Sequence, residues 1–294
     1  MLRFRTLGLL LNVVLLAFSP APGAAQAGDP ESDARATRIR QETTNSRTSP
    51  PTTEVMITIL GRGALRLDTE LDAEGAPLVS TIFRVEQDSF LILLHDTQEA
   101  AIQDREQLRV IAERRQALEK RLEERLAEDP TGEAAAHARM LELRKETARL
   151  EAQKDPKGKP AGVRFEKTSE SGELLGYPWN KYRQVRDGLL VQELLVTPWP
   201  DLGLGDEAAL VFERMSRFVE DAMEIAGGVR RMENPYEPYL ELGGFPLVIR
   251  YFNPQGESVA ETRAVSIETV AGNGVFENPG YPEKGIAEDL PELE

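Results

Sequence analysis

The feature that most constrains this fold is a pair of β-prone runs in residues 172–199, which meet at Asp187-Gly188. Asp-Gly between two such runs predicts a tight hairpin turn, because glycine readily takes the positive φ that the turn needs. The second run, residues 189–196, has apolar side chains at three positions on each of its faces. A strand that is wet on one side would show polar alternation, so this run is expected to be covered on both sides. We therefore predict that it forms the centre of a sheet that curls over a second layer.

The first 27 residues have the anatomy of a secretory signal peptide. A basic start with Arg3 and Arg5 precedes an apolar run at residues 7–18, and Ala25-Gln26-Ala27 fits a signal-peptidase site. The apolar run is about a dozen residues, whereas a spanning helix needs roughly 20, which disfavours the alternative of an uncleaved anchor. There is no cysteine for lipid attachment. We expect a mature chain that begins near Gly28, has no transmembrane segment and resides in the periplasm.

The composition excludes several classes of protein. The chain has no cysteine, which rules out a disulfide scaffold, a thiol nucleophile and a Cys-ligated metal. Its formal charge is −15, and removal of the two arginines in the signal peptide changes it by −2, to −17. A protein this acidic is not expected to use nucleic acid or an anionic membrane as its main partner.

After the signal peptide the chain divides into a polar leader, one folded domain and an acidic tail. Residues 28–53 are rich in Asp, Glu, Arg, Thr, Ser and Pro, which predicts a disordered leader. The folded domain is expected over residues 54–282, and residues 283–294 are expected to form a loose tail. Runs with period-two alternation predict an antiparallel meander at the start of the domain, over residues 55–60, 64–69, 79–85 and 89–95.

A helical hairpin is predicted as an insert at residues 98–155. Residues 99–128 contain no Gly or Pro and are dense in strong helix formers. Residues 133–153 resume this pattern after a break at Asp129-Pro130. The apolar stripe is too narrow for burial in a globular core, so the two arms are expected to pair with each other as a coiled coil.

A second helix is predicted over residues 206–226, and it is strongly amphipathic. Phe212, Met215 and Phe218 lie on its apolar face, which makes it the element expected to cover the curved sheet. Further strands are predicted at residues 163–168, 245–252 and 258–270. The expected fold is of the α+β class: an antiparallel sheet curled into an incomplete β-barrel, packed on this helix and carrying the helical hairpin.

No motif for catalysis or metal binding stands out. The two histidines, His95 and His137, fall on different predicted elements, and the sequence has no HExxH, Cys/His cluster or GxSxG. Gly61-Arg62-Gly63 lacks the third glycine of a dinucleotide loop, so a β-turn explains it better. Glu193 stands among apolar residues, and a salt-bridged or rim position is favoured over an inward-facing functional carboxylate. We expect no catalytic residue, metal or cofactor, and hence not an enzyme.

Large apolar side chains from several predicted elements would line the space between the sheet and the amphipathic helix. That space is either a filled core or a pocket for an apolar guest, and aromatic residues more commonly fill cores. The candidate lining residues are Tyr177, Trp179, Phe212, Met215, Phe218, Phe245, Leu247, Ile249 and Tyr251.

Short motifs in the second half of the chain resemble a known family. They are GELLGY at residues 172–177, Lys181-Tyr182, Trp199, GFPLVIR at residues 244–250 and FENPGY at residues 276–281. The pattern is similar to a secreted bacterial family with a domain of unknown function, itself similar to the periplasmic lipoprotein carriers of the LolA/LolB type. The resemblance spans residues 54–281 without the helical insert, and it implies a periplasmic half-barrel wrapped around helices. In those carriers the hollow holds acyl chains, and the family pattern contains no catalytic residues.

Three functional hypotheses follow from these expectations. The first is a non-enzymatic periplasmic binding protein whose hollow accepts an apolar ligand, such as a lipid or a lipoprotein acyl chain. The second is an envelope scaffold that engages a partner protein through the helical hairpin, although a tolerated insertion at a surface turn also explains those arms. An enzyme is the third and least supported, because the sequence contains no recognisable catalytic set.

Overall fold

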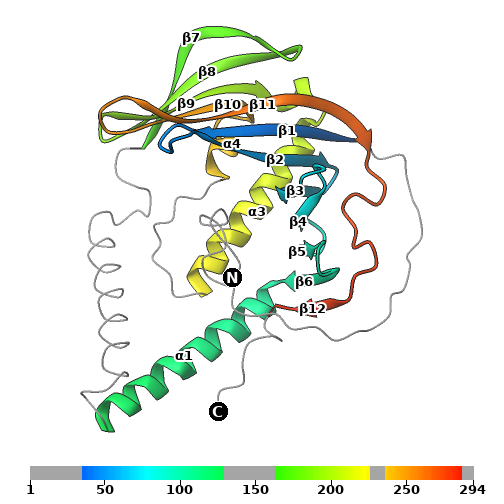
Figure 1. The fold of residues 1–294 in the computed structure, drawn as a ribbon, viewed down its shortest axis with the longest axis vertical. Coiled ribbons are helices and arrows are strands. Elements are labelled where there is room, and N and C mark those ends of the chain that lie inside the picture. The colour runs from blue at the N-terminus through cyan, green and yellow to red at the C-terminus, as the bar shows by residue number, and fades with distance from the viewer. Residues whose placement is uncertain (1–34, 129–162, 226–235, 287–294) are drawn as a thin grey trace.

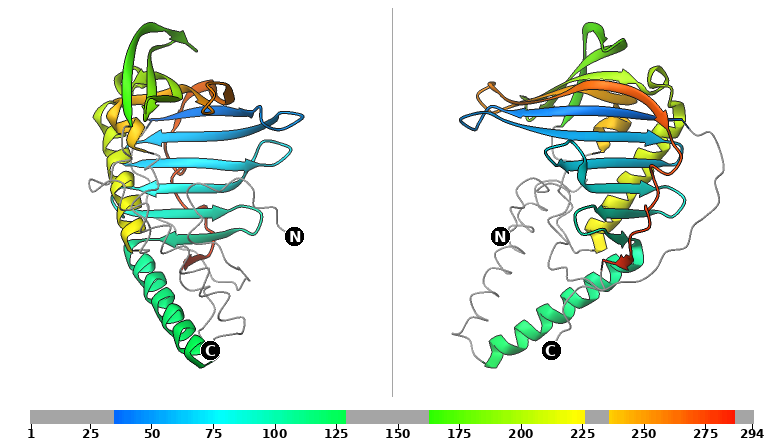
Figure 2. Two further views of the ribbon diagram at one scale, coloured as in Figure 1. Left: turned by 90° about the vertical axis from the view of Figure 1, so that its left-hand side faces the viewer. Right: turned by 45° about the vertical axis from the view of Figure 1, so that its right-hand side comes forward.

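The computed structural model describes residues 35–128, 163–225 and 236–286. A twelve-stranded sheet dominates them, with the order β12-β6-β5-β4-β3-β2-β1-β11-β10-β9-β8-β7. The pairs are antiparallel except for β12 and β6, which are parallel. The end strands β12 and β7 do not pair with each other, so the sheet is curled but not closed into a barrel (Figures 1 and 2). This arrangement of a curled sheet with few helices fits the predicted α+β class.

Most strands coincide with runs that the sequence analysis predicted as strands, and the exceptions are β1, β6 and β12. In chain order they are β1 (Arg35–Asn45), β2 (Thr52–Gly61), β3 (Ala64–Leu71), β4 (Pro77–Arg84), β5 (Ser89–Leu94), β6 (Glu99–Gln103), β7 (Arg164–Leu174), β8 (Tyr177–Arg186), β9 (Leu189–Pro198), β10 (Gly244–Phe252), β11 (Ser258–Ala271) and β12 (Glu283–Gly285). The helices of the described residues are α1 (Arg105–Glu128), the 3-10 helix η1 (Trp199–Leu202), α3 (Gly205–Ile225) and α4 (Glu237–Glu241).

The amphipathic helix α3 packs against one face of the sheet, which we call the inner face. The end of the sheet with β7–β11 turns over α3, while β2–β6 run down beside it (Figure 2). Phe212, Met215 and Phe218 are at most 2% exposed and belong to one apolar core with side chains of the sheet. The ring of Phe218 lies 5.1 Å from that of Phe90 in β5. The prediction that this helix covers the curved sheet is confirmed.

The strand in the middle of the sheet comes from the segment predicted to be a disordered leader. β1 pairs with β2 on one side and with β11 on the other. Ile39 and Gln41 are buried on the inner face, while Arg40 and Glu42 alternate with them and are only half-buried. The prediction is wrong from Arg35 onward, because a strand needs apolar residues at alternate positions only and its backbone makes the pairing. Residues 28–34 and the predicted signal peptide, 1–27, lie outside the described residues.

The hairpin predicted around Asp187-Gly188 is present as β8 and β9, and both turn residues have positive φ, 49° and 81°. Its position in the sheet was predicted wrongly, because β9 is third from one end and not central. Coverage of β9 on both faces is also wrong. Leu194 is buried but Leu189 is 51% exposed. Leu195 on the other face lies opposite Lys181 and is only half-buried.

The helical insert begins later than predicted. Glu99–Gln103 forms β6 in register with β5, because Ala100 and Ala101 are both buried there and this gain overrides helix propensity. α1 then buries Leu108 and Ala112 against the body and extends beyond the sheet (Figure 1). The predicted second arm, residues 133–153, lies outside the described residues.

The C-terminal segment crosses the opposite, outer face of the sheet. In residues 275–286, which we call the C-terminal strap, Phe276 and Tyr281 pack on an apolar patch of β4, β5 and β6. The strap ends in β12, which pairs with the edge of β6. The prediction of a loose tail is therefore wrong for residues 283–285, since backbone hydrogen bonds hold them. Residues 287–294 lie outside the described residues.

Candidate functional site

Five of the nine candidate lining residues come together in the core between α3 and the sheet. They fill this space with one another and with neighbouring rings, since the ring of Phe212 stacks 5.2 Å from Trp199 and 4.6 Å from Tyr239. Each of the five is at most 2% exposed: Phe212, Met215, Phe218, Phe245 and Leu247. For these residues the structure favours the core interpretation that the sequence left open.

The other four lining candidates lie outside this core. Tyr177 packs at its border and is only partly buried. Trp179 lies over Gly172 of β7, where a Cβ atom would come within 2.6 Å of the indole, so only glycine fits. Ile249 and Tyr251 lie farther along β10 and are half-buried. The predicted set therefore divides into a core and a partly accessible remainder.

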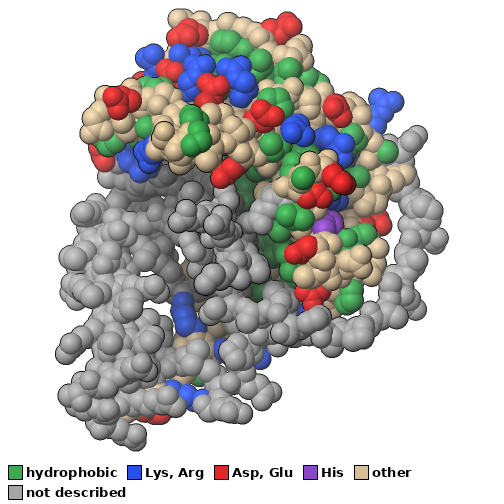
Figure 3. Space-filling view, viewed as in Figure 1, with side chains coloured by type: hydrophobic (Ala, Val, Ile, Leu, Met, Phe, Trp, Pro, Cys, Tyr) green, Lys and Arg blue, Asp and Glu red, His purple; other side chains and the backbone are tan. Residues whose placement is uncertain are grey.

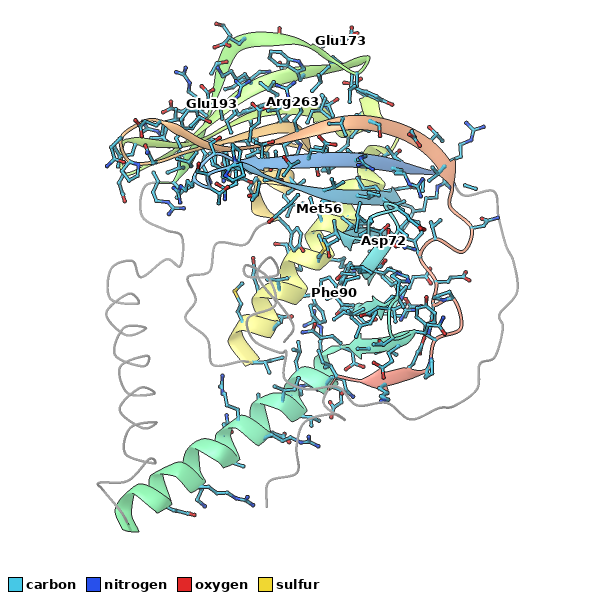
Figure 4. All side chains as sticks on the ribbon, viewed as in Figure 1. Met56, Asp72, Phe90, Glu173, Glu193 and Arg263 are labelled. Atoms are coloured by element: carbon cyan, nitrogen blue, oxygen red, sulfur yellow. The ribbon has the colours of Figure 1, made fainter. Side chains whose placement is uncertain are left out.

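A strip of partly buried side chains continues the inner face from the core toward the β1–β2 and β10–β11 turns. Register places Ile249 of β10 opposite Thr262 of β11, which is opposite Thr43 of β1. The hydroxyls of Thr43 and Thr262 are hydrogen-bonded at 2.8 Å. We call this strip the inner rim, and it consists of Thr43, Met56, Tyr239, Ile249, Tyr251 and Thr262, with Met56 visible on the α3 side of the sheet in Figure 4.

The six residues of the inner rim are uncharged, and the exposed Glu54 of β2 lies opposite Thr43 at its border. Burial raises the pKa of Tyr239, and the neighbouring Tyr251 and Tyr236 raise it further. Burial likewise raises the pKa of Tyr251, against a smaller lowering by its hydrogen bond with Thr262. The phenols therefore stay protonated at neutral pH. The rim offers apolar surface with a few hydroxyl groups, which suits an amphiphilic or apolar guest and no charged one.

Three buried polar atoms near the start of β10 lack a hydrogen-bond partner: Gln41 Oε1, Thr197 Oγ1 and Trp199 Nε1. The amide nitrogen of Gln41 donates to the carbonyl of Pro246 at 3.4 Å, which leaves its oxygen unused. Thr197 is opposite Phe245 in the β9–β10 pair. Sequence reasoning missed these atoms and Tyr239, because only the pairing of distant strands brings them together.

Glu193 does not point into the interior. Its carboxylate lies on the outer face (Figure 4), 3.1 Å from Lys181 Nζ, 3.3 Å from Arg183 Nε and 3.9 Å from Arg250. The salt-bridged interpretation is therefore confirmed. Figure 3 shows that charged side chains of both signs gather over this end of the sheet.

The remaining chemistry-bearing residues form no reactive set. His95 contacts Ser80, but Ser80 is fully buried and donates its own proton to Asp68 at 2.6 Å, so it is not placed as a nucleophile. His137 lies outside the described residues. Within the described ranges no cluster of three potential metal ligands occurs, and no helix is long and apolar enough to cross a membrane.

No family model matches the chain, and no curated protein matches its sequence. Among solved structures, it is similar to an uncharacterized conserved protein from Thermus thermophilus, at 7% identity and a TM-score of 0.36, over 85% of this chain and 90% of that one. It is also similar to PNGF-II, at 13% identity and a TM-score of 0.37, over 87% of this chain but 32% of that one.

A putative outer membrane lipoprotein-sorting protein domain from Vibrio parahaemolyticus is similar at 7% identity and a TM-score of 0.27, over 83% of this chain and 89% of that one. The structural neighbours therefore include a lipoprotein-sorting domain, as the motifs led us to expect. All three TM-scores are below 0.5, so these likenesses carry no argument about function.

Proposed function

We propose that this chain is a non-enzymatic periplasmic binding protein that holds an apolar ligand, such as a lipid or a lipoprotein acyl chain, against its inner rim. The observation that carries the proposal is the uncharged, partly exposed strip of Met56, Ile249, Tyr251 and Tyr239 directly beside a filled core. A guest on this strip would extend the core and remove apolar surface from water, at about 25 cal/mol for each Å² buried.

The periplasmic part of the proposal rests on the signal-like segment at residues 1–27. Export can be tested by fractionation and by sequencing the N-terminus of the mature protein. A mature chain that begins near Gly28 supports the proposal, whereas a chain that retains Met1 in the cytoplasm contradicts it.

The ligand can be sought in protein purified from its native envelope, by lipid extraction and mass spectrometry. The matched variant is Ile249→Asp, which places a carboxylate in the inner rim. We expect it to weaken binding of a fluorescent fatty acid by at least about tenfold, since burying an unpaired charge costs more than the 1.4 kcal/mol that tenfold represents.

The control is Leu189→Asp, at a side chain that is already 51% exposed in the β8–β9 hairpin. It should bind the fatty acid as the wild type does. Absence of any copurified apolar species, together with equal affinities for the wild type and Ile249→Asp, would overturn the proposal.

A second candidate function, an envelope scaffold, is favoured by one observation: α1 extends away from the body (Figure 1). Its 24 residues span about 36 Å at 1.5 Å per residue. Arg105 anchors its first turn by ion pairs with Asp88 and with Asp221 of α3. The helix is thus held at its first turn, and exposed side chains such as Arg109 and Lys120 lie farther along it.

Charge reversal on the exposed side of α1 tests this candidate. Arg109→Glu with Lys120→Glu changes two side chains that are 63% and 80% exposed. Loss of a crosslinked envelope partner, with unchanged circular dichroism and fatty-acid binding, supports the scaffold. Arg62→Glu, at a side chain 77% exposed near the other end of the domain, is the control.

A further inference from the structure

A hydrogen-bonded network on the outer face links β3, β4 and the turn after β5 to the C-terminal strap. The His95 ring contacts Ser80 Oγ through Nε2 at 2.7 Å and the Tyr281 hydroxyl through Nδ1 at 3.0 Å. Ser80 donates to Asp68 at 2.6 Å, and Arg66 binds Asp68 at 2.6 Å and Ser80 at 3.0 Å. The strap is thus joined to β3 and β4 through one imidazole.

The donors and acceptors of this network fix the tautomer of His95. The single hydroxyl proton of Ser80 goes to the Asp68 carboxylate, so Ser80 Oγ can only accept from the imidazole. His95 therefore carries its proton on Nε2, and its unprotonated Nδ1 accepts from the Tyr281 hydroxyl. A second proton would bind at Nδ1 and would change the Tyr281 hydroxyl from donor to acceptor.

The strap has further attachments, most of them near its end. β12 pairs with β6, Lys284 lies 3.9 Å from Glu99, and Ile286 is buried against Ile92 and Ala101. The amide of Ala100 donates to Pro282 O at 3.0 Å, and the amide of Ile286 donates to Ile102 O at 3.1 Å. Arg66 also donates to the Val275 carbonyl at 2.9 Å. Beneath the strap lies the apolar patch of Ile82, Leu91, Leu93 and Ala100, all of them buried.

We propose that the C-terminal strap is a pH-sensitive cover, held closed by neutral His95 and loosened when the imidazole is protonated. Protonation at Nδ1 reverses the hydrogen bond with Tyr281, whose hydroxyl oxygen then accepts. It also places an imidazolium beside the Arg66 guanidinium, which contacts the same Ser80 hydroxyl and donates to the Val275 carbonyl of the strap. The closed strap covers both cations, whereas opening lets water screen one from the other. The loosened strap exposes the apolar patch and the β6 edge, both of which the closed strap keeps from water.

The surroundings of His95 favour its neutral form in the folded protein, as the proposal requires. Burial lowers its pKa below the ordinary value of 6.5, and Arg66 of β3 lowers it further. Asp68 of β3 and Asp96 in the β5–β6 turn act in the opposite direction but do not reverse the shift. Tyr281 of the strap lies against the His95 ring, so opening removes part of this burial. Closure is therefore expected to be fully stable above pH 6.5 and to weaken as the pH falls below it.

Hydrogen exchange of residues 275–286 tests the proposal on the full mature chain, at about pH 7.5 and about pH 5.5. After correction for the intrinsic pH dependence of exchange, we expect strap opening to be several-fold more populated at the lower pH. A hydrophobic dye should bind more strongly there, while far-ultraviolet circular dichroism stays unchanged. Equal opening at both pH values would overturn the proposal.

The chain has two histidines, so each can be replaced in turn. His95→Gln cannot take up a proton in this range, and its strap opening should not respond to pH. His137→Gln should respond as the wild type does. A His95→Gln protein with the wild-type response would overturn the proposal.

Tyr281→Phe keeps the test decisive if His95→Gln does not fold. It removes the hydroxyl that donates to His95 and should raise strap opening several-fold at pH 7.5. It should also reduce the difference between the two pH values. Wild-type protection of the strap in Tyr281→Phe at pH 7.5 would likewise contradict the proposal.

Discussion

The outer face of the sheet has two halves that organise their polar residues differently. On the covered half, β3–β6 under the strap, the side chains of Asp68 and Arg66 are 5% and 15% exposed and share hydrogen bonds with neutral groups. On the open half, β8–β11, Glu261 binds Arg250 and Arg263, with side chains 31% to 42% exposed. On the covered half the ion pair is strengthened because it is shielded from water, whereas on the open half water screens the ion pairs.

This difference decides how much each ion pair contributes to stability. If the carboxylate of a shielded pair is removed by mutation, its guanidinium partner remains as an uncompensated buried charge. If the carboxylate of an exposed pair is removed, water hydrates the remaining guanidinium. It also decides the pH response, because the covered half contains an imidazole and the open half contains only carboxylates and permanent cations within its network.

The largest effect is expected from Asp68→Ala. It leaves Arg66 shielded and unpaired, and we expect a loss of about 3 kcal/mol in the free energy of unfolding, measured with urea. Glu261→Ala removes a comparable pair on the open half and should cost less than about 1 kcal/mol. Equal losses in the two variants would show that the strap does not shield the covered half.

Glu193→Gln probes the one carboxylate of the open half that is itself shielded, at 12% side-chain exposure. Because Lys181 and Arg183 both lie within 3.3 Å of it, we expect a loss of about 1.5 to 2 kcal/mol. The control is Glu213→Gln on α3, whose pair with Arg217 is exposed and should contribute about 0.3 to 0.5 kcal/mol. If Glu193→Gln lost as little stability as the control, burial would not determine how much an ion pair contributes to stability.

Local pattern predicted those parts of the fold whose neighbours in sequence are also their neighbours in space. The Asp187-Gly188 turn and the amphipathic stripe of α3 are set by adjacent residues, and both are confirmed. The prediction failed for β1, whose polar composition hides a strand that pairs with β2 on one side and with β11 on the other. β11 is more than 200 residues away, and Thr43 and Thr262 are 219 positions apart. Composition alone cannot report such a partner.

The candidate site shows the same division. The sequence identified inner-face residues such as Phe212 and Ile249 from helical and strand periodicity. It could not tell which of them would fill the core and which would remain at the rim, since that depends on where α3 crosses the sheet. Tyr239 belongs to no element predicted from the sequence, yet its ring stacks on Phe212.

A smaller effect is expected from Tyr281→Phe. It removes one neutral hydrogen bond between the strap and His95, which should cost about 1 kcal/mol in the stability of the closed strap at neutral pH. Limited proteolysis within residues 275–286 measures it. The control is Tyr177→Phe, on β8 and away from the strap. Equal cleavage of the two variants would show that the Tyr281 hydroxyl does not stabilise the closed strap.

The smallest effect is expected in the acid range, from Glu261→Gln. Burial alone would raise the pKa of Glu261, but hydrogen bonds and charges from Arg250 and Arg263 lower it below the ordinary 4.5. A lowered pKa in the folded state contributes stability above 4.5 that is lost as the pH falls through the folded value. Glu261→Gln should therefore lose slightly less stability than the wild type on acidification below that value, and behave as the wild type in the range where His95 titrates. If it altered the response between about pH 7 and 5 instead, the two halves of the outer face would not be independent.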